Sequence, residues 1–306
     1  GRPDVVMAMS PPVFLGDAAW LLARRWRVPL VVNLQDIFPD IAVELGALSG
    51  ERILGLARRH ERSLYRRADG ITVLSEDQAR NVRAKLDVDA PDKIAVIRNF
   101  VDLERIKPVD RDNEYRRRHD LVGRQVVMYS GNVGLSQSFE LVRAAADRWQ
   151  DRPDVVFVIN GEGAARPEVD RWAAGRDNVR VVDFGPRGDI ETILGAADLH
   201  LILLRGGLAR SSTPSKFYSI LAAGRPVLAS IDEGSEVSSV IKEVDVGAAV
   251  PPEDPWAFCQ ALEQLLSDPG ELAVMGDRAR NYAECCLTAA AQAAAYEALF
   301  KRICPR

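Results

Sequence analysis

Residues 211–230 read SSTPSKFYSILAAGRPVLAS, and this stretch predicts a helix followed by a buried parallel strand. Ser212 or Thr213 can cap the helix, Pro214 suits its first turn, and Gly224 stands where a C-terminal glycine belongs. PVLAS has the apolar character of a strand covered on both faces. Capping needs one hydroxyl, whereas several hydroxyls, free backbone N–H groups and a nearby lysine also suit a phosphate.

The same alternation of strand and helix continues along the rest of the chain. Short apolar segments such as DVVMAMS (4–10), QVVMYSG (125–131) and LHLILL (199–204) are separated by amphipathic segments. This order predicts an α/β fold with parallel sheets. Around residues 101–120 the apolar signal weakens and charge rises, so we expect a boundary between two doubly wound units there.

Composition excludes several classes of protein. The chain has 306 residues, is 47% hydrophobic and 27% charged, and is long enough for two domains. A net charge of −4 argues against a nucleic-acid partner. Four late cysteines without a C-x-x-C pair are typical of thiols in a reducing compartment, and three dispersed histidines give no support to a metal cluster. Neither a membrane-spanning run nor a signal peptide is visible.

The start of the chain carries a separate expectation. It begins GRPDVVMAMSPP, without a methionine, and DVVMAMS already resembles a buried strand. We therefore expect the N-terminal domain to be incomplete at its start, with its first βα units missing.

Five successive strand ends in the second half carry glycine-containing or polar loops. Each alone reads as a turn, but parallel strands bring their carboxyl ends to one edge of a sheet, where ligands bind. Arg205, Arg210 and Lys216 favour a phosphorylated ligand, and Glu233 or Glu236 is suited to ribose hydroxyls. The loops are YSGNVGLSQS (129–138), INGEG (159–163), DFGPRGD (183–189), LILLRGGLARSSTPSK (201–216) and LASIDEGSEV (228–237).

An ordered set of segments resembles the retaining glycosyltransferases of family 4, in particular the bacterial branch with the O-antigen fucosamine transferase and colanic-acid transferases. The resemblance covers nearly the whole chain and implies a GT-B fold, in which two Rossmann-like domains face a cleft. It implies an acceptor-side domain at 1–106, a nucleotide-sugar domain at 107–288, and a terminal helix at 289–306 that packs back toward the first domain. The segments are QDIFPD, VLSE, KIAVIRNFVD, YSGNVGLSQ, NGEG, FGPR, TPSKFYSILAAGRPVLAS and PPEDP.

The resemblance also implies an activity. The enzyme would move a hexose or amino-deoxyhexose from a nucleotide-diphosphate sugar, preferably a UDP-sugar, to a lipid-linked or polysaccharide acceptor with retention. It would need no metal or cofactor and would act in surface-polysaccharide biosynthesis, in the cytoplasm at the inner face of the plasma membrane. A sugar-nucleotide epimerase of the same fold and a non-catalytic nucleotide-sugar-binding module remain as alternatives. An NAD-dependent enzyme lacks support because no G-x-G-x-x-G fingerprint is present.

Individual residues receive roles from the same resemblance. Lys216 would neutralise the donor diphosphate as a catalytic residue. Asp36, at a strand end, is suited to orienting or deprotonating the acceptor hydroxyl, although it is equally suited to capping a helix or forming a turn. The further diphosphate contacts would be Gly131, Asn132, Gly134, Arg205, Arg210, Ser212, Thr213 and Ser215. The nucleoside contacts would be Gly161, Glu162, Gly185, Pro186, Arg187 and Glu236.

The chain departs from the family pattern at two places. Ser211 and Ser219 stand where many members carry two glutamates, and Gly131-Asn132 stands where others place an arginine. The positive charge must therefore come from Lys216, Arg205 or Arg210. A DVD sequence at Asp87–Asp89 resembles a metal-binding D-x-D, but it precedes APDK in an expected helix-to-strand loop and is taken as coincidence.

The helix expected at residues 51–68 is rich in arginine. Its other face carries Ile53, Leu56, His60 and Leu64 at helical spacing, so we expect His60 to pack among apolar residues. The basic face is either simply solvated or a contact with anionic lipid. Its arginines are Arg52, Arg58, Arg59, Arg62, Arg66 and Arg67.

Overall fold

A computed structural model describes residues 1–86 and 91–304, which divide into two compact units. The first unit spans Gly1–Asn99, Gly207–Thr213 and Ala289–Arg306, and the second spans Phe100–Gly206 and Pro214–Thr288. The chain thus leaves the first unit after Asn99, a few residues before the sequence-based boundary at 106. Parallel sheets in both units confirm the predicted α/β class.

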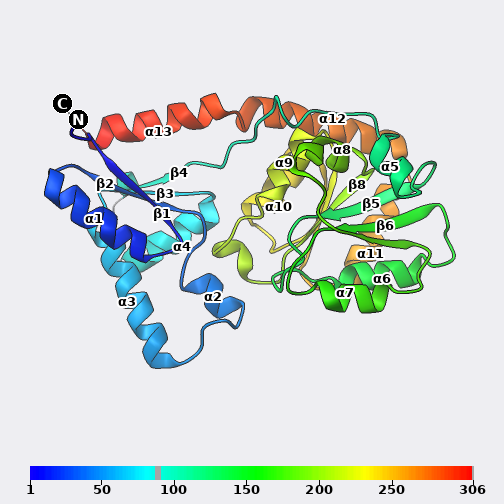
Figure 1. Ribbon diagram of the computed structural model, residues 1–306, viewed down its shortest axis with the longest axis horizontal. Coiled ribbons are helices and arrows are strands. Elements are labelled where there is room, and N and C mark those ends of the chain that lie inside the picture. The colour runs from blue at the N-terminus through cyan, green and yellow to red at the C-terminus, as the bar shows by residue number, and fades with distance from the viewer. Residues whose placement is uncertain (87–90, 305–306) are drawn as a thin grey trace. The chain divides into compact units, whose positions relative to one another are not determined.

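The first unit is built on a four-stranded parallel sheet in the order β1-β2-β3-β4. Helices α1, α3 and α4 cover one face, and α13 covers the other, where Leu299 packs with Val31 and Ile97 (Figure 1). Strand β2 is buried along its whole length because both of its faces are covered. The bounds are β1 Val6–Ser10, α1 Phe14–Trp26, β2 Leu30–Leu34, α2 Asp40–Glu44, α3 Glu51–Arg67, β3 Gly70–Val73, α4 Glu76–Leu86, η1 Pro91–Lys93, β4 Ile94–Val96 and α13 Ala289–Ile303.

The helix α3 differs from its predicted packing. Leu64 is buried, but Ile53 and Leu56 are 61% and 70% exposed. His60 does not pack among apolar residues; its Nε2 lies 3.0 Å from a carboxylate oxygen of Asp17 on α1. The prediction for His60 was wrong because the buried face of the helix runs through Glu61, Leu64 and Tyr65, and His60 lies beside this face, toward Asp17.

The segment Gly207–Thr213 joins the first unit through backbone pairing. The Ile37 N–H donates to the Ser211 carbonyl at 2.8 Å, and Asp36 and Ser212 form an isolated antiparallel bridge. The Asn81 side chain donates to the Arg210 carbonyl at 3.1 Å. This segment includes the 3-10 turn η3 (Leu208–Arg210).

The second unit contains a six-stranded parallel sheet in the order β10-β9-β8-β5-β6-β7. Helices α6, α7 and α11 pack on one face, while α5, α8, α9 and α12 lie on the other side in Figure 1. The strand order reverses between β5 and β8, the switch point at which doubly wound sheets bind ligands. The bounds are α5 Glu114–Arg118, β5 Gln125–Ser130, α6 Glu140–Arg148, β6 Val155–Asn160, α7 Arg166–Ala173, β7 Val179–Val182, η2 Arg187–Asp189, α8 Ile190–Gly195, β8 Leu199–Leu203, α9 Lys216–Ala222, β9 Val227–Ser230, α10 Glu236–Val244, β10 Gly247–Val250, α11 Pro255–Leu266 and α12 Pro269–Cys286.

The helix predicted within residues 211–224 is shorter than the sequence indicated. It begins at Lys216 with Ser215 as its N-cap, and no side chain caps it. The capping role predicted for Ser212 or Thr213 was therefore wrong, because both residues belong to the segment held by the first unit. Gly224 does follow the helix with a φ of +65°, as the sequence predicted.

No helix within residues 1–86 and 91–304 is long and apolar enough to cross a membrane.

Candidate functional site

The loops that follow β5 and β8 interlock at the switch point of the second sheet. The Ser138 N–H donates to the Leu203 carbonyl at 3.0 Å, and the Arg205 N–H donates to the Ser136 carbonyl at 3.0 Å. Gln137 and Leu204 form an isolated bridge between the same two loops. This pairing fixes the edge of the sheet at which the sequence predicted a ligand.

Lys216 lies at this edge and contacts Tyr129. Its Nζ stands 3.7 Å from the centroid of the Tyr129 ring and donates to the Tyr129 hydroxyl. The side chain is partly buried, and burial lowers the pKa of Lys216 to about 7. Among the residues that the structure describes, Lys216 forms no ion pair, so its charge is uncompensated. An anion bound here would supply the missing counter-charge.

Glycines let the neighbouring loops approach one another and Lys216. A Cβ on Gly131, whose φ is +138°, would stand 2.9 Å from the Lys216 Nζ. A Cβ on Gly161, whose φ is +152°, would stand 1.9 Å from the Gly131 carbonyl oxygen. A Cβ on Gly163 would stand 2.4 Å from the Val133 carbonyl oxygen. The loops after β5 and β6 are therefore in direct backbone contact, which a side chain at these positions would prevent.

Asn132 and Gly134 complete the loop after β5. The Asn132 carbonyl accepts a hydrogen bond from the Tyr129 hydroxyl at 2.6 Å. The Gly134 N–H donates to the Gln137 side chain at 2.9 Å. The structure thus brings Gly131, Asn132 and Lys216 together at the end of β5, with Gly134 in the same loop, and their role as diphosphate contacts stays a prediction.

Phe184 is a candidate site residue that the sequence analysis did not single out. Its side chain is 52% exposed just after β7, and its ring lies 3.4 Å from the position that a Cβ on Gly161 would take. Arg166 fixes this region by donating to the Gly161 carbonyl at 2.5 Å and pairing with Asp183 at 2.9 Å. The available signal was an aromatic residue in a strand-end loop, DFGPR.

The other predicted nucleoside contacts lie at three different strand ends. Glu162 follows β6, and its carbonyl accepts from the Val133 N–H at 2.7 Å. Gly185 and Pro186 follow β7 and are exposed, while the side chain of Arg187 lies outside the described part of the structure. Glu236 is the first residue of α10, after β9, and so lies on the β8 side of the switch point, away from β6 and β7.

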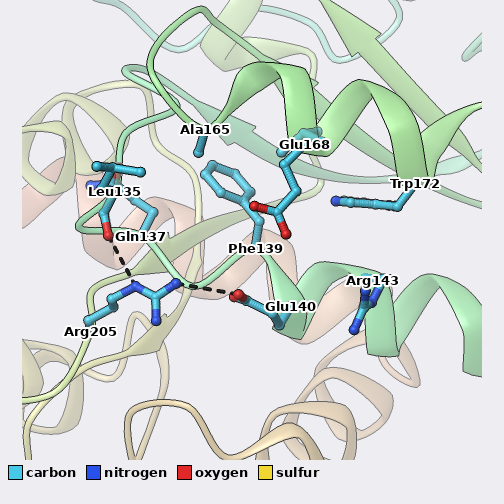
Figure 2. A pocket seen from close by; sticks show the side chains of 10 residues that line it. Leu135, Gln137, Phe139, Glu140, Arg143, Ala165, Glu168, Trp172 and Arg205 are labelled. Carbon is cyan, nitrogen blue, oxygen red and sulfur yellow. Dashed lines mark hydrogen bonds and ion pairs between the residues drawn. The ribbon is translucent and has the colours of Figure 1, made fainter.

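The Arg205 side chain is held by other residues of the second unit. Figure 2 shows its guanidinium directed toward the Leu135 carbonyl, 3.0 Å away, and the Glu140 carboxylate, 3.4 Å away. Glu253 binds the same guanidinium at 2.8 Å. Arg205 lines a small groove between α6 and α7 that also contains Trp172, and two carboxylates already compensate its charge. The structure therefore does not place Arg205 with the groups around Lys216.

The remaining predicted residues divide between the units. Asp36, Arg210, Ser212 and Thr213 belong to the first unit, where the backbones of Asp36 and Ser212 pair. Asp36 caps no helix, because α2 begins at Asp40 with Pro39 as its N-cap. Ser215 belongs to the second unit and is exposed next to Lys216.

Within the described ranges, no three His, Cys, Asp or Glu side chains lie close enough together to hold a metal ion. The DVD sequence at Asp87–Asp89 lies outside the described residues.

Two units in tandem, each built on a parallel sheet and the second doubly wound, are the architecture of GT-B glycosyltransferases. Residues 1–99 match the family described as glycosyl transferase 4-like domain, and residues 124–268 match glycosyl transferases group 1. The chain therefore belongs to the family-4 glycosyltransferases, and the resemblance inferred from its motifs is confirmed.

Similar proteins are known among curated sequences and solved structures. The chain is 29% identical to the probable glycosyltransferase WbjE of Pseudomonas aeruginosa, over 86% of this chain and 66% of that protein. It is 28% identical to the putative colanic acid biosynthesis glycosyl transferase WcaI of Escherichia coli K12, over 92% of this chain and 70% of that protein. It spans about two thirds of the length of these relatives. The crystal structure of Anabaena HepE in complex with UDP superposes with a TM-score of 0.76 at 15% identity, covering 96% of this chain and 78% of that one, which confirms the GT-B fold.

Proposed function

We propose that this chain transfers a hexose or amino-deoxyhexose from a nucleoside-diphosphate sugar, with UDP as the favoured nucleotide, to a lipid-linked or polysaccharide acceptor. The observation that carries the proposal is Lys216, a partly buried cation without a carboxylate partner among the described residues, at the switch point of the second sheet. The preference for UDP is supported by the solved complexes of HepE with UDP and with UDP-glucose. A role in surface-polysaccharide synthesis is supported by the similarity to WcaI.

The chemistry follows from where negative charge develops. Breaking the bond between sugar and diphosphate leaves charge on the leaving phosphate, which fixed cations and N–H groups stabilise without reorganising. Lys216 supplies the cation, and the glycine-containing loop after β5 gives the diphosphate close access to it. We propose that transfer proceeds with retention and without a metal or cofactor. Asp36, partly exposed after β2, is the proposed acceptor-orienting residue.

A direct test combines ligand binding with product analysis. A thermal-shift panel of UDP-, GDP-, ADP- and dTDP-sugars should raise the melting temperature most with a UDP-sugar, because a ligand that binds only the folded state stabilises it. Nuclear magnetic resonance of the product should then show the donor's anomeric configuration retained on an added acceptor. Isomerisation of the donor without any acceptor would instead indicate an epimerase, and binding without turnover would indicate a binding module.

Phe184 is expected to stack on the nucleobase. Phe184→Ala should weaken UDP binding about tenfold, since stacking of a base on an aromatic ring contributes about 1–3 kcal/mol. Isothermal titration calorimetry measures this, and Phe184→Trp should restore most of the affinity. Phe100→Ala is the matched control, because Phe100 is a similarly exposed phenylalanine, at 58%, in the same unit. Equal UDP affinity in Phe184→Ala and the wild type would contradict this role.

A membrane contact through α3 is proposed for a lipid-linked acceptor, at the inner face of the plasma membrane. Ile53 and Leu56 are exposed beside Arg58 and Arg59, a pattern that suits an anionic bilayer surface. Replacing both arginines with glutamate should reduce co-sedimentation with phosphatidylglycerol vesicles about tenfold or more, because each basic residue contributes about 1 kcal/mol. The same change at Arg117 and Arg118, an exposed pair on α5 of the second unit, should have little effect. Equal losses for both pairs would reject a specific contact at α3.

A further inference from the structure

Tyr129 belongs to the buried strand β5, but its side chain contacts the charged residue Lys216. It is fully buried in β5 and packs edge-on against Phe139, with the ring centroids 4.9 Å apart at an interplanar angle of 77°. This packing fixes the plane of the ring. The hydroxyl is therefore held at the carboxyl end of β5, at the switch point where Lys216 lies.

The hydroxyl of Tyr129 makes two hydrogen bonds of opposite sense. It donates to the Asn132 carbonyl at 2.6 Å and accepts from the Lys216 ammonium. One bond reaches the loop that carries Gly131 and Gly134, and the other reaches the first residue of α9. A single neutral group thus connects the two parts of the proposed diphosphate site, which lie on separate elements.

We propose that Tyr129 is a positioning residue. It holds Lys216 over its ring and links it to the loop after β5, so that the ammonium is already in place when the donor diphosphate binds. This inference rests on the proposed function of the same site. The Tyr129 hydroxyl suits the task because it is uncharged: a carboxylate in its place would neutralise Lys216 and compete with the ligand. Burial raises the pKa of the Tyr129 hydroxyl, so it stays neutral over the range in which proteins are assayed.

His200 on β8 interacts electrostatically with Lys216, but burial lowers the pKa of His200 to about 4, so it is uncharged above pH 6. The loop from Gly131 to Ser138 contains no charged residue, and neither does the rest of α9. A pH-dependent signal from this site between pH 6 and 10 can therefore be assigned to Lys216.

The test uses Tyr129→Phe, which keeps the ring and its packing on Phe139 but removes the hydroxyl. The reactivity of Lys216 toward an amine-acylating reagent is measured from pH 6 to 10 by mass spectrometry of the labelled peptide, without nucleotide. In the wild type we expect the midpoint near the Lys216 pKa of about 7. In Tyr129→Phe the released ammonium regains water, and the midpoint should move up toward the ordinary lysine value. An unmoved or lowered midpoint overturns the proposal, because a lysine that stayed buried after losing its hydrogen-bond acceptor would have an unchanged or lower pKa.

A second measurement links the position of Lys216 to the ligand. Tyr129→Phe should weaken UDP-glucose binding about tenfold or more, as expected for losing a hydrogen bond to a charged group. Tyr65→Phe, which removes the hydroxyl that donates to Glu61 at 2.9 Å in the first unit, should leave the affinity unchanged. Undiminished affinity in Tyr129→Phe would overturn the proposal. If the wild-type protein bound no nucleotide sugar, the proposed function would fail, whereas the labelling midpoints would still decide the role of Tyr129.

Discussion

Lys216→Ala is expected to lower the rate of sugar transfer by about 30- to 1000-fold while the protein remains folded. Removing one preorganised group that stabilises developing negative charge costs about 2–4 kcal/mol of transition-state stabilisation. Lys216→Ala should not destabilise the folded protein. Burial lowers the pKa of Lys216, which means that the protonated lysine destabilises the folded state. The destabilisation of the folded state by the protonated lysine is largest below pH 7, where Lys216 is protonated in the folded and unfolded states, and it fades toward pH 10.5.

The measurement is a steady-state assay of UDP release with acceptor, together with a thermal melt of each variant. Lys242→Ala is the control, because Lys242 is an exposed lysine on α10 of the same unit that pairs only loosely with Glu233, at 3.4 Å. It should retain full activity. Near-normal transfer by Lys216→Ala, or a melting temperature far below that of the wild type, would contradict the assigned role.

Gly161→Ala should abolish donor binding and destabilise the second unit by about 3 kcal/mol or more. An alanine there would adopt a φ of +152°, which L-residues rarely populate and which costs about 1–3 kcal/mol. Its Cβ would also stand 1.9 Å from the Gly131 carbonyl oxygen, so the loop carrying Gly131 must move away. That movement would separate Gly131 from Lys216. Denaturant unfolding and calorimetric titration with UDP-glucose measure the two effects.

Gly175→Ala separates the two causes. Gly175 has a φ of +77°, but no atom lies within 4 Å of the position that its Cβ would take. This variant should lose stability through backbone strain and still bind UDP-glucose normally. If Gly161→Ala bound the donor as well as Gly175→Ala does, the contact between the loops after β5 and β6 would not matter for the site.

Local patterns predicted most of the regular structure. The helix expected at residues 51–68 forms over Glu51–Arg67, because amphipathic periodicity acts over a few neighbouring residues. The return of residues 207–213 to the first unit was not predicted. It depends on pairing between the backbones of Asp36 and Ser212, which lie far apart in the sequence and carry no local signature of it.

The residues of the candidate site could likewise be predicted only in part from the sequence. Gly131, Gly161 and Lys216 could be found because glycines and a lysine at strand ends have a chemical meaning by themselves. Tyr129 could not, because in QVVMYS it is indistinguishable from a core residue until Lys216, 87 residues later, is seen against it. Arg205 carried the same phosphate signal as Lys216, but Glu140 and Glu253 bind it in the folded chain. The sequence alone does not show whether a charged side chain is already paired with an opposite charge in the folded chain.

A crystal structure of the protein with a bound UDP-sugar would show whether Lys216 binds the donor diphosphate. We expect a diphosphate oxygen within about 3 Å of the Lys216 Nζ, as in charge-assisted hydrogen bonds generally, with the diphosphate lying along Gly131 and Asn132. A nucleotide bound elsewhere, with Lys216 still in contact with Tyr129 and no phosphate beside it, would contradict the role of Lys216 in donor binding.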